Sequence, residues 1–385
     1  MANGTRDAQK SSTTQFELSD AQRVAWLRLI RSENVGAATF RDLINHCGSA
    51  QTAIEMLPEL AKRGGRLAKV RVTSQAEAED ELSEAKRSGA RIIGIGEPDY
   101  PPMLRMMASA PPLVTVKGNI DLATRPSVGI VGSRNASMVG LKVARSFASD
   151  LGQHGFAIVS GLARGIDKAA HEASVSTGTT AVLAGGLNRP YPPENLEILA
   201  RIENDGFGYS VSEQPLNWEP RARDFPKRNR LIAGLSAGVI VVEATKRSGS
   251  LITARLAGEI GRLVLAIPGS PLDPRSQGTN GLIRDGATLV GTPEEVVEAI
   301  QPTLGSPRQS REQPSLLEPE NTFTLPAPES VRAQVLSLLG PTPTDLDDVI
   351  AETGASPSEV FLIVLELDLA GRIERHSGNR VSLIE

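Results

Sequence analysis

The chain has 385 residues, of which 40% are hydrophobic and 22% charged, and a formal net charge of −4. That length exceeds one ordinary hydrophobic core, so we expect two or three domains, and the composition is that of a soluble globular protein. A single cysteine, Cys47, excludes an internal disulfide framework, and no apolar run reaches the roughly 20 residues that span a bilayer, so the sequence favours a cytoplasmic location without membrane contact.

The N-terminal part of the sequence predicts a short lead and then a helical domain. Residues 1–16 are polar and lack the apolar core of a signal peptide, so we expect a disordered lead. Within residues 17–91, the segment "LSDAQRVAWLRLIRSENVG" opens with a helix-capping Ser-Asp pair and repeats apolar residues at helical spacing. The pattern resembles a helix-hairpin-helix or SAM-like unit, and a plain helical packing domain is the alternative.

Residues 92–301 alternate strand-like and helical stretches. After a proline-punctuated extended segment (92–118), short apolar runs recur from residue 127 onwards, with helical stretches between them. Residues 239–242 and 263–267 are continuously apolar, which is typical of strands covered on both faces. Strand and helix in regular succession predict an α/β domain with a Rossmann-like, doubly wound parallel sheet. The predicted strands are "SVGIVG", "FAIVS", "TTAVLAGG", "YSVSE", "AGVIVVEA" and "RLVLAIPG".

The C-terminal part predicts a linker and a third domain. Residues 302–330 are rich in proline and serine and have no apolar periodicity, which indicates a linker. Residues 331–385 predict three helices and a terminal extended pair, an order that is typical of a winged helix. Because this segment has few cations and many acids, it does not favour a grip on duplex DNA, and we interpret it as a partner-binding or regulatory module.

Glycine-rich turns follow the predicted strands. In a parallel sheet, the loops after successive strands all emerge at the carboxyl edge. Glycine lets a backbone N–H group approach an anion closely, and the helix N-termini that follow add partial positive charge. The sequence therefore predicts a row of anion-binding turns along one edge. The turns are "GIVGSRNASMVG", "SGLARGIDKAAH", "AGGLNRPYPPEN", "SEQPLNWEPRARDFPKRNR" and "EATKRSGSLITA".

The segment "RARDFPKRNRLIAG" (221–234) concentrates positive charge on the same edge, just ahead of an apolar helical run. Arg134 and Arg164, which follow the first two strands, are expected to converge there. Lys227 and Arg230 are three residues apart and share a helix face. This charge suits a polyanion better than a single nucleotide, and because aromatic residues are scarce, phosphate contacts would supply most of the affinity. The cations of the segment are Arg221, Arg223, Lys227, Arg228 and Arg230.

The sequence shows no constellation of catalytic or metal-binding residues, so we predict neither an enzyme activity nor a cofactor. It has no GxxxxGK[ST] phosphate loop and no nucleophile elbow, and its four histidines and one cysteine lack metal-ligand spacing. Asp167 falls in the first turn of a predicted helix, where an acid favours the helix dipole. Glu243 ends an apolar strand near Lys246, so an ion pair between them is the simplest interpretation.

Four segments of the middle domain carry a family resemblance. They are "VGIVGSRNASMVG", "IVSGLARGIDKAAHEASVSTGTTAVLAGGLNRPYPPEN", "FPKRNRLIAGLSAGVIVVEATKRSGSLITARLAGEIGR" and "VLAIPGSPLDPRSQGTNGLIRDGA". Together they cover residues 127–290 almost continuously and closely resemble the DNA-processing protein A family (DprA/Smf). The resemblance implies a protein of natural transformation that binds single-stranded DNA, protects incoming strands and helps to load the RecA recombinase, often as a homodimer.

The same resemblance implies a pocket for single-stranded DNA, formed by the Gly-Ser-Arg turn and the Phe-x-x-Arg-Asn-Arg run. A base stacked on Phe225 would add roughly 1–3 kcal/mol, and a staple that anchors the helix start is the alternative role for this ring. Tyr191 is interpreted as a loop anchor. The implied pocket residues are Gly132, Ser133, Arg134, Ser160, Gly161, Arg164, Gly185, Gly186, Phe225, Lys227, Arg228, Asn229, Arg230, Ser248, Gly249 and Ser250.

Two other functions stay open at this point. Related Rossmann-like phosphoribohydrolases process nucleotides and resemble this sheet edge, but they carry a PGGxGTxxE turn. This chain has "RSGSLITARLAGE" instead, which removes the catalytic acid from its expected place. The other alternative is a scaffold that binds protein partners through its two end domains.

Overall fold

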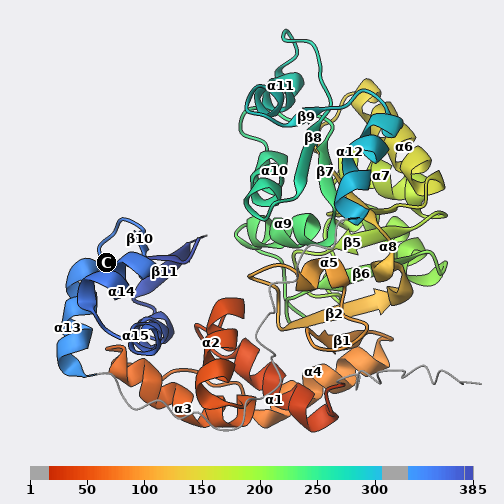
Figure 1. Ribbon diagram of the computed structural model, residues 1–385. Helices are drawn as coiled ribbons and strands as arrows, with labels where there is room; N and C mark the ends of the chain where they lie inside the picture. The colour runs from red at the N-terminus through yellow and green to blue at the C-terminus, as the bar shows by residue number, and fades with distance from the viewer. Residues whose placement is uncertain (1–16, 306–327, 377, 385) are drawn as a thin grey trace, which may run out of the picture.

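The computed structural model describes residues 17–305, 328–376 and 378–384. The predicted lead (1–16) and residues 306–327 of the predicted linker lie outside the described residues. Within them, a helical N-terminal domain, a central sheet with helices on both faces and a C-terminal winged helix follow one another along the chain (Figure 1). Among the described helices, none is both long and apolar enough to cross a membrane.

The N-terminal domain consists of four helices around a buried tryptophan. Ser19 caps the first helix through a capping box with Gln22, which satisfies two of the free N–H groups at the helix start. Trp26 and Phe40 meet edge to face with ring centroids 5.1 Å apart, and both are fully buried. The predicted helical domain is confirmed. Its helices are α1 (Asp20–Arg31), α2 (Ala37–Cys47), α3 (Ala50–Arg63) and α4 (Gln75–Arg87).

The central sheet has nine strands in the order β1-β2-β6-β5-β4-β3-β7-β8-β9, and all strands from β6 to β9 in this order are parallel. All six strands predicted from the sequence are present. The segment predicted as extended adds β1 and β2 as antiparallel strands at one edge. The strands are β1 (Arg91–Gly94), β2 (Leu113–Gly118), β3 (Ser127–Val131), β4 (Ala157–Ser160), β5 (Thr179–Val182), β6 (Gly208–Ser212), β7 (Gly238–Val241), β8 (Leu263–Ala266) and β9 (Thr288–Leu289).

The strand order reverses direction at β3. From β3 the chain moves outward through β4, β5 and β6, and it then returns to the other side of β3 with β7 and continues to β8. The doubly wound, Rossmann-like sheet predicted from the sequence is therefore confirmed. In such sheets, ligands bind outside the carboxyl ends of the strands at the reversal, because the connections on the two sides diverge there. Here that crevice lies between β3 and β7.

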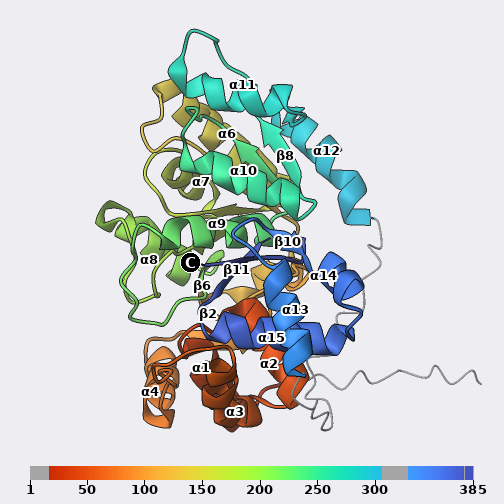
Figure 2. The same ribbon diagram turned by 90° about the vertical axis from the view of Figure 1, so that its left-hand side faces the viewer.

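Helices cover both faces of the sheet. One face packs against α6, α7 and α12, and the other against α8, α9 and α10 (Figures 1 and 2). The short α5 packs against α9, and α11 lies beyond β8. The helices are α5 (Pro102–Arg105), α6 (Met138–Gln153), α7 (Ile166–Ser174), α8 (Leu196–Asn204), α9 (Asp224–Leu235), α10 (Gly249–Glu259), α11 (Gln277–Arg284) and α12 (Pro293–Gly305).

The C-terminal domain is a winged helix that packs against the N-terminal domain. Its third helix, α15, contacts α2 and α3, and Leu362, Leu365 and Leu369 join the apolar cluster of the N-terminal helices (Figure 2). Arg375 bridges Asp42 of α2 and Asp368 of α15, at 2.8 and 2.7 Å. The winged helix predicted from the sequence is confirmed. Its elements are α13 (Glu329–Leu338), β10 (Thr344–Asp345), α14 (Leu346–Thr353), α15 (Pro357–Leu369), β11 (Ile373–His376) and β12 (Arg380–Leu383).

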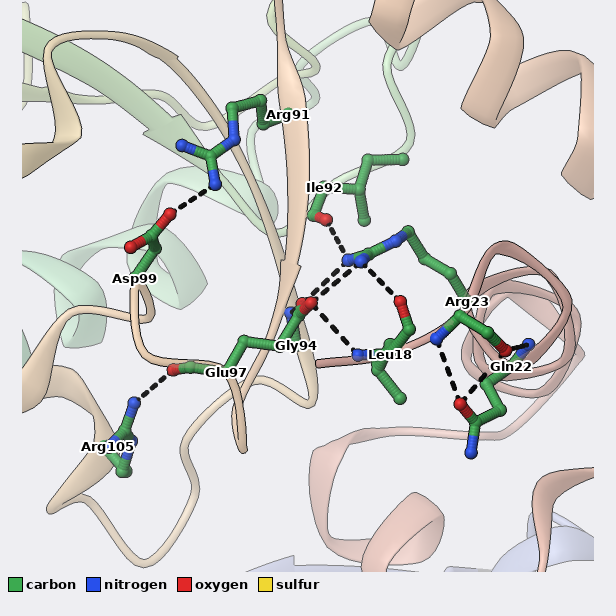
Figure 3. Close-up of polar contacts among 10 residues, drawn as sticks. Leu18, Gln22, Arg23, Arg91, Ile92, Gly94, Glu97, Asp99 and Arg105 are labelled. Atoms are coloured by element: carbon green, nitrogen blue, oxygen red, sulfur yellow. Dashed lines mark hydrogen bonds and ion pairs between the residues drawn. The ribbon is translucent and has the colours of Figure 1, made fainter. Parts of the chain in front are cut away.

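The N-terminal domain is joined to the sheet edge by a largely buried ion pair. Arg23 of α1 donates to both carboxylate oxygens of Glu97, which follows β1, at 2.7 and 2.8 Å (Figure 3). The same guanidinium bonds the carbonyl oxygens of Leu18 and Ile92, and Glu97 also accepts from the N–H groups of Leu18 and Gly94. Because donors on both sides of the boundary share one carboxylate, α1 and β1 form a single rigid unit.

The buried His171 makes the stability of the sheet domain depend on pH. Its ring is fully buried on α7, where Nδ1 lies 2.8 Å from Thr179 Oγ1, and burial lowers its pKa from 6.5 to about 3. The unfolded chain therefore binds more protons between these two values. As the pH falls below about 6.5, the free energy of unfolding should fall, by about 1 kcal/mol between about pH 7.5 and about pH 5.5. Urea unfolding at the two pH values measures the difference.

The His171→Asn variant provides the comparison. Asparagine keeps a polar group near Thr179 but does not titrate, so the variant should lose the part of the pH dependence that His171 contributes. An identical pH dependence in wild type and variant would contradict this account.

Candidate nucleic-acid interface

A cavity of about 900 Å³ opens outside the carboxyl ends of β3 and β7, in the crevice at the reversal of strand order. Five chain segments line it: the turn after β3, the turn between β4 and α7, the first turns of α9, the start of α10 and the loop after β8. The residues that line the cavity include Gly132, Ser133, Arg134, Phe225, Arg228, Asn229, Ser248, Gly249, Ser250 and Arg275.

The turn after β3 presents Arg134. The Ile166 side chain lies only 2.6 Å from where a Cβ of Gly132 would be, so a side chain at this position would push the turn away from α7. Ser137 donates to the Glu243 carboxylate from its N–H group at 3.0 Å and from its hydroxyl at 2.6 Å. The predicted pair of Glu243 with Lys246 is therefore wrong: the carboxylate fixes the turn that carries Arg134.

The first turn of α9 supplies an aromatic wall. The guanidinium of Arg134 lies 5.5 Å from the centre of the Phe225 ring, and the Tyr191 ring meets Phe225 edge-on at 5.9 Å. Arg134, Arg164, Tyr191 and Phe225 also line a small adjoining pocket. Phe225 is half-buried. It is therefore anchored by neighbours and still presents surface to both cavities.

Arg228 is a buried cation at the base of the cavity. It donates to the carbonyl oxygen of Val182 at 2.6 Å, and its Nε has no hydrogen-bond partner among the described residues. Burial lowers the pKa of Arg228 to about 10, so the group stays charged at neutral pH. Asp167 compensates this charge, and its carboxylate accepts from the N–H groups of Gly161 and Ala163 at 3.1 and 3.4 Å.

Asp167 thus has a different role from the one that the sequence suggested. It is buried, and desolvation raises the pKa of its carboxyl group while the nearby Arg228 lowers it. Its contacts close the turn after β4, which is more specific than a favourable interaction with the helix dipole. Asp167 and Arg228 together therefore fix the floor of the cavity.

The start of α10 supplies a site for an anion. Ser248, Gly249 and Ser250 line the cavity, and the two serine hydroxyls lie 2.8 Å apart. Asn229 Nδ2 donates to the Gly249 carbonyl at 3.3 Å, which holds the first turns of α9 and α10 together. A helix N-terminus with hydroxyl groups beside it stabilises phosphate through its free N–H groups and its dipole.

The structure brings together most of the predicted pocket residues, with clear exceptions. Ser160 is fully buried and donates to the Ile130 carbonyl, so it shapes the sheet end and does not line the cavity. Gly185 and Gly186 pack against the backbone of residues 215–218, where a Cβ would clash. Arg164 reaches the adjoining pocket, where its guanidinium pairs with Glu194.

Lys227 and Arg230 also differ from the prediction. Lys227 is exposed on α9 outside the residues that line the two cavities. Arg230 pairs with Glu213 and donates to the Ser109 carbonyl at 2.7 Å, so its charge is directed toward the loop after β6. Arg134 and Arg164 therefore converge as predicted, whereas Arg230 does not join them.

Two features of the site were missed from the sequence. Arg275, in the loop after β8, lines the cavity and bonds Asp273 through Nε at 3.1 Å. The predicted row of turns includes only those after the first five strands, although the same edge rule places the loop after β8 there too. The second feature is a cation–π contact next to the first turn of α9, where the Arg221 guanidinium lies 4.6 Å from the centre of the Trp218 ring.

The arrangement suits binding of a phosphate chain. Arg134, Arg228 and Arg275 and the start of α10 surround one cavity, while its acids Asp167 and Asp273 already have partners. Among the described residues, no group of three or more histidine, cysteine or acidic side chains is arranged to hold a metal ion. The fold and the site define a Rossmann-like protein with a cationic cavity at its topological switch point.

The comparisons with known proteins identify the family. The model of DNA recombination-mediator protein A matches residues 91–301, the DprA-like N-terminal HHH domain matches residues 20–84 and the DprA winged helix domain matches residues 319–379. The chain therefore belongs to the DNA-processing protein A (DprA/Smf) family. The resemblance predicted from the sequence is confirmed.

Individual relatives agree with this assignment. Protein Smf of Escherichia coli is 38% identical over 310 residues, which cover 79% of this chain and 80% of that protein. The DNA processing protein DprA of Streptococcus pneumoniae is 46% identical over 207 residues, 52% of this chain and 71% of the relative.

Two solved structures are similar to this chain. The crystal structure of DprA from Streptococcus pneumoniae matches with a TM-score of 0.60 and 34% identity over 74% of this chain and 99% of its own. DprA of Helicobacter pylori, whose structure describes a single-stranded DNA binding mode of that protein, matches with a TM-score of 0.51 and 26% identity, covering 56% of this chain and 96% of its own.

Gly161 should be essential for the position of Arg228. A Cβ at Gly161 would lie 2.0 Å from an Nη atom of Arg228, so Gly161→Ala would displace a buried guanidinium from the Val182 carbonyl. We expect the free energy of unfolding to fall by about 1–3 kcal/mol. Gly249→Ala is the matched control, because no atom lies within 4 Å of its Cβ position. Urea unfolding of both variants measures this, and equal midpoints would contradict it.

Proposed function

We propose that this protein binds single-stranded DNA, without regard to base sequence, at the cavity between β3 and β7. The observation that carries the proposal is the convergence of Arg134, Arg228 and Arg275 on the start of α10 at the topological switch point. Membership of the DprA family and the binding mode described for the Helicobacter pylori protein support it.

The proposed contacts are mostly to the phosphate chain. The N–H groups and hydroxyls at Ser248–Ser250 would hold one phosphate, and Arg134 and Arg275 would neutralise its neighbours. Phe225 would stack against a base, which any base permits, so this contact adds affinity without sequence preference. Ser160, Gly185 and Gly186 would act indirectly by shaping the neighbouring turns. Lys227 and Arg230 would contact a strand only outside the cavity.

The biological role that we propose is that of a recombination mediator in DNA uptake. The protein would cover incoming single strands in the cytoplasm, as a homodimer, and promote the loading of RecA onto them without itself catalysing a reaction. The support is the family assignment, whose central domain is that of a DNA recombination mediator. A faster appearance of RecA on an oligonucleotide coated with single-strand-binding protein would test the role, and an unchanged rate would contradict it.

The Arg134→Ala variant tests the site. Loss of one phosphate contact should weaken binding of a single-stranded oligonucleotide roughly threefold to tenfold and reduce the slope of log K against log[salt] by about 0.7. Fluorescence anisotropy across a salt series measures both quantities. A duplex of the same sequence should bind less tightly, because the narrow cavity accommodates a flexible strand.

Arg201→Ala is the matched control for charge. Arg201 is an exposed arginine in the last turn of α8, and α8 leads into the start of β6, at the opposite edge of the sheet from the cavity. The Arg201→Ala variant removes the same charge far from the cavity, where salt screens it. Its effect on DNA affinity should therefore be small at moderate salt. If Arg134→Ala and wild type had equal affinities and equal salt slopes, the proposed location of the DNA-binding site in the cavity would be contradicted.

A further inference from the structure

We infer that the N-terminal helical domain positions the DNA-binding cavity, and that Glu84 of α4 is the main positioning residue. The inference rests on the proposed function, since it concerns the same cavity. Glu84 does not line this cavity. It acts through two segments, called here the support loops: residues 183–192, between β5 and α8, and residues 213–223, between β6 and α9.

Both carboxylate oxygens of Glu84 hold a support loop. Asn188 Nδ2 donates to Oε1 at 3.0 Å, and Asn217 Nδ2 donates to Oε2 at 2.7 Å. Asn188 Nδ2 also donates to Asn217 Oδ1 at 3.0 Å, so the three side chains form a closed triangle. A single residue of the N-terminal domain therefore joins the two loops to each other and to α4.

A second contact fixes the start of the second support loop. Arg31 of α1 donates to the Glu213 carbonyl at 2.9 Å, while two of its nitrogens bond the Glu81 carboxylate of α4 at 2.9 and 3.2 Å. The Glu213 carboxylate in turn pairs with Arg230 of α9. These side chains are largely buried, so the contacts between α1, α4 and α9 are well shielded from water.

The second support loop leads directly into the cavity wall. Trp218 Nε1 and the Arg221 N–H group both donate to Asp224 Oδ2, at 2.8 and 2.9 Å, and Asp224 begins α9. The Gly186 N–H group donates to the Trp218 carbonyl at 3.0 Å, which ties the first support loop to the same point. A displacement of the loops would therefore move the turn that carries Phe225.

The N-terminal domain can act as a support because it is fixed independently of these loops. The Arg23–Glu97 pair and its surrounding bonds attach α1 to the region of β1 (Figure 3). The support loops follow β5 and β6, which lie further along the same sheet. The helices thus connect two separate regions of one sheet, and the position of the loops depends on both attachments.

The sign of the effect separates positioning from simple electrostatics. Glu84 is an acid near a site for a polyanion, so removing its charge should by itself tighten DNA binding slightly. Positioning predicts the opposite, because the Glu84→Ala variant leaves both asparagine side chains without their acceptor. Glu84→Gln removes the charge and keeps an acceptor oxygen for only one of the two asparagine amides, so it should restore part of the binding.

The experiment compares these variants in the full chain. We expect Glu84→Ala to bind a single-stranded oligonucleotide roughly threefold to tenfold more weakly than wild type, and Glu84→Gln to bind with an affinity between those of Glu84→Ala and wild type. Glu79→Ala is the matched control, since Glu79 is an exposed acid on the same helix and bonds the neighbouring Gln75. It should leave affinity unchanged or slightly increased. Asn217→Ala, which removes one bond of the triangle, should weaken binding in the same direction.

Tryptophan fluorescence reports on the support loop without DNA. The chain has two tryptophans, and Trp26 is only 1% exposed, so acrylamide quenching reports mainly on Trp218. Quenching should increase in Glu84→Ala and increase less in Glu84→Gln, which keeps one acceptor oxygen.

Either of two results would overturn the inference. The first is that folded Glu84→Ala binds DNA as tightly as wild type, and the second is that acrylamide quenching of Trp218 is unchanged in this variant. If wild type itself failed to bind single strands, the proposed function would fall. The quenching series of the DNA-free protein would still decide the positioning role. Should Glu84→Ala not fold, Asn217→Ala carries both measurements.

Discussion

The cavity depends on one buried guanidinium. Arg228 reaches the Val182 carbonyl across the end of β4, and it can do so because Gly161 has no side chain to block it. An uncompensated charge at this depth would cost several kcal/mol, and Asp167 supplies the compensation while its carboxylate closes the turn after β4. The ends of β4 and β5 and the first turns of α7 and α9 are thereby fixed together.

The remaining cations divide into those that stay available and those that the protein uses for itself. Arg134 lines the cavity, and Arg275 lines it while it also pairs with Asp273. Arg230 is engaged by Glu213 outside the cavity and helps to hold the loop before α9. A dense run of positive charge in the sequence therefore has two roles, and only some of it is available for an anion.

The sequence predicted the elements well because the signals are local. Continuous apolar runs define the buried strands, and glycine-rich turns after them define the carboxyl edge, so the doubly wound sheet and the edge that carries the candidate site followed from a general rule. The partners of buried polar groups could not be predicted in this way. Ser137 and Glu243 are 106 residues apart, and Arg31 meets the Glu213 carbonyl across 182 residues. The edge strand β9 was missed because it has only 2 residues, both of them exposed.

The packing of the winged helix against the N-terminal domain also depends on long-range contacts that local signals in the sequence do not predict. On α15, Leu362, Leu365 and Leu369 face the N-terminal helices, so the helix that enters the groove in DNA-binding winged helices is here largely buried within the chain. From the sequence alone, these leucines could equally belong to the core of the winged helix. In the folded chain, α2 and α3 are covered on one side by α15, and α1 and α4 hold the sheet on the other. A helical domain that is held on both sides is better suited to fixing the geometry of the cavity than to binding DNA itself.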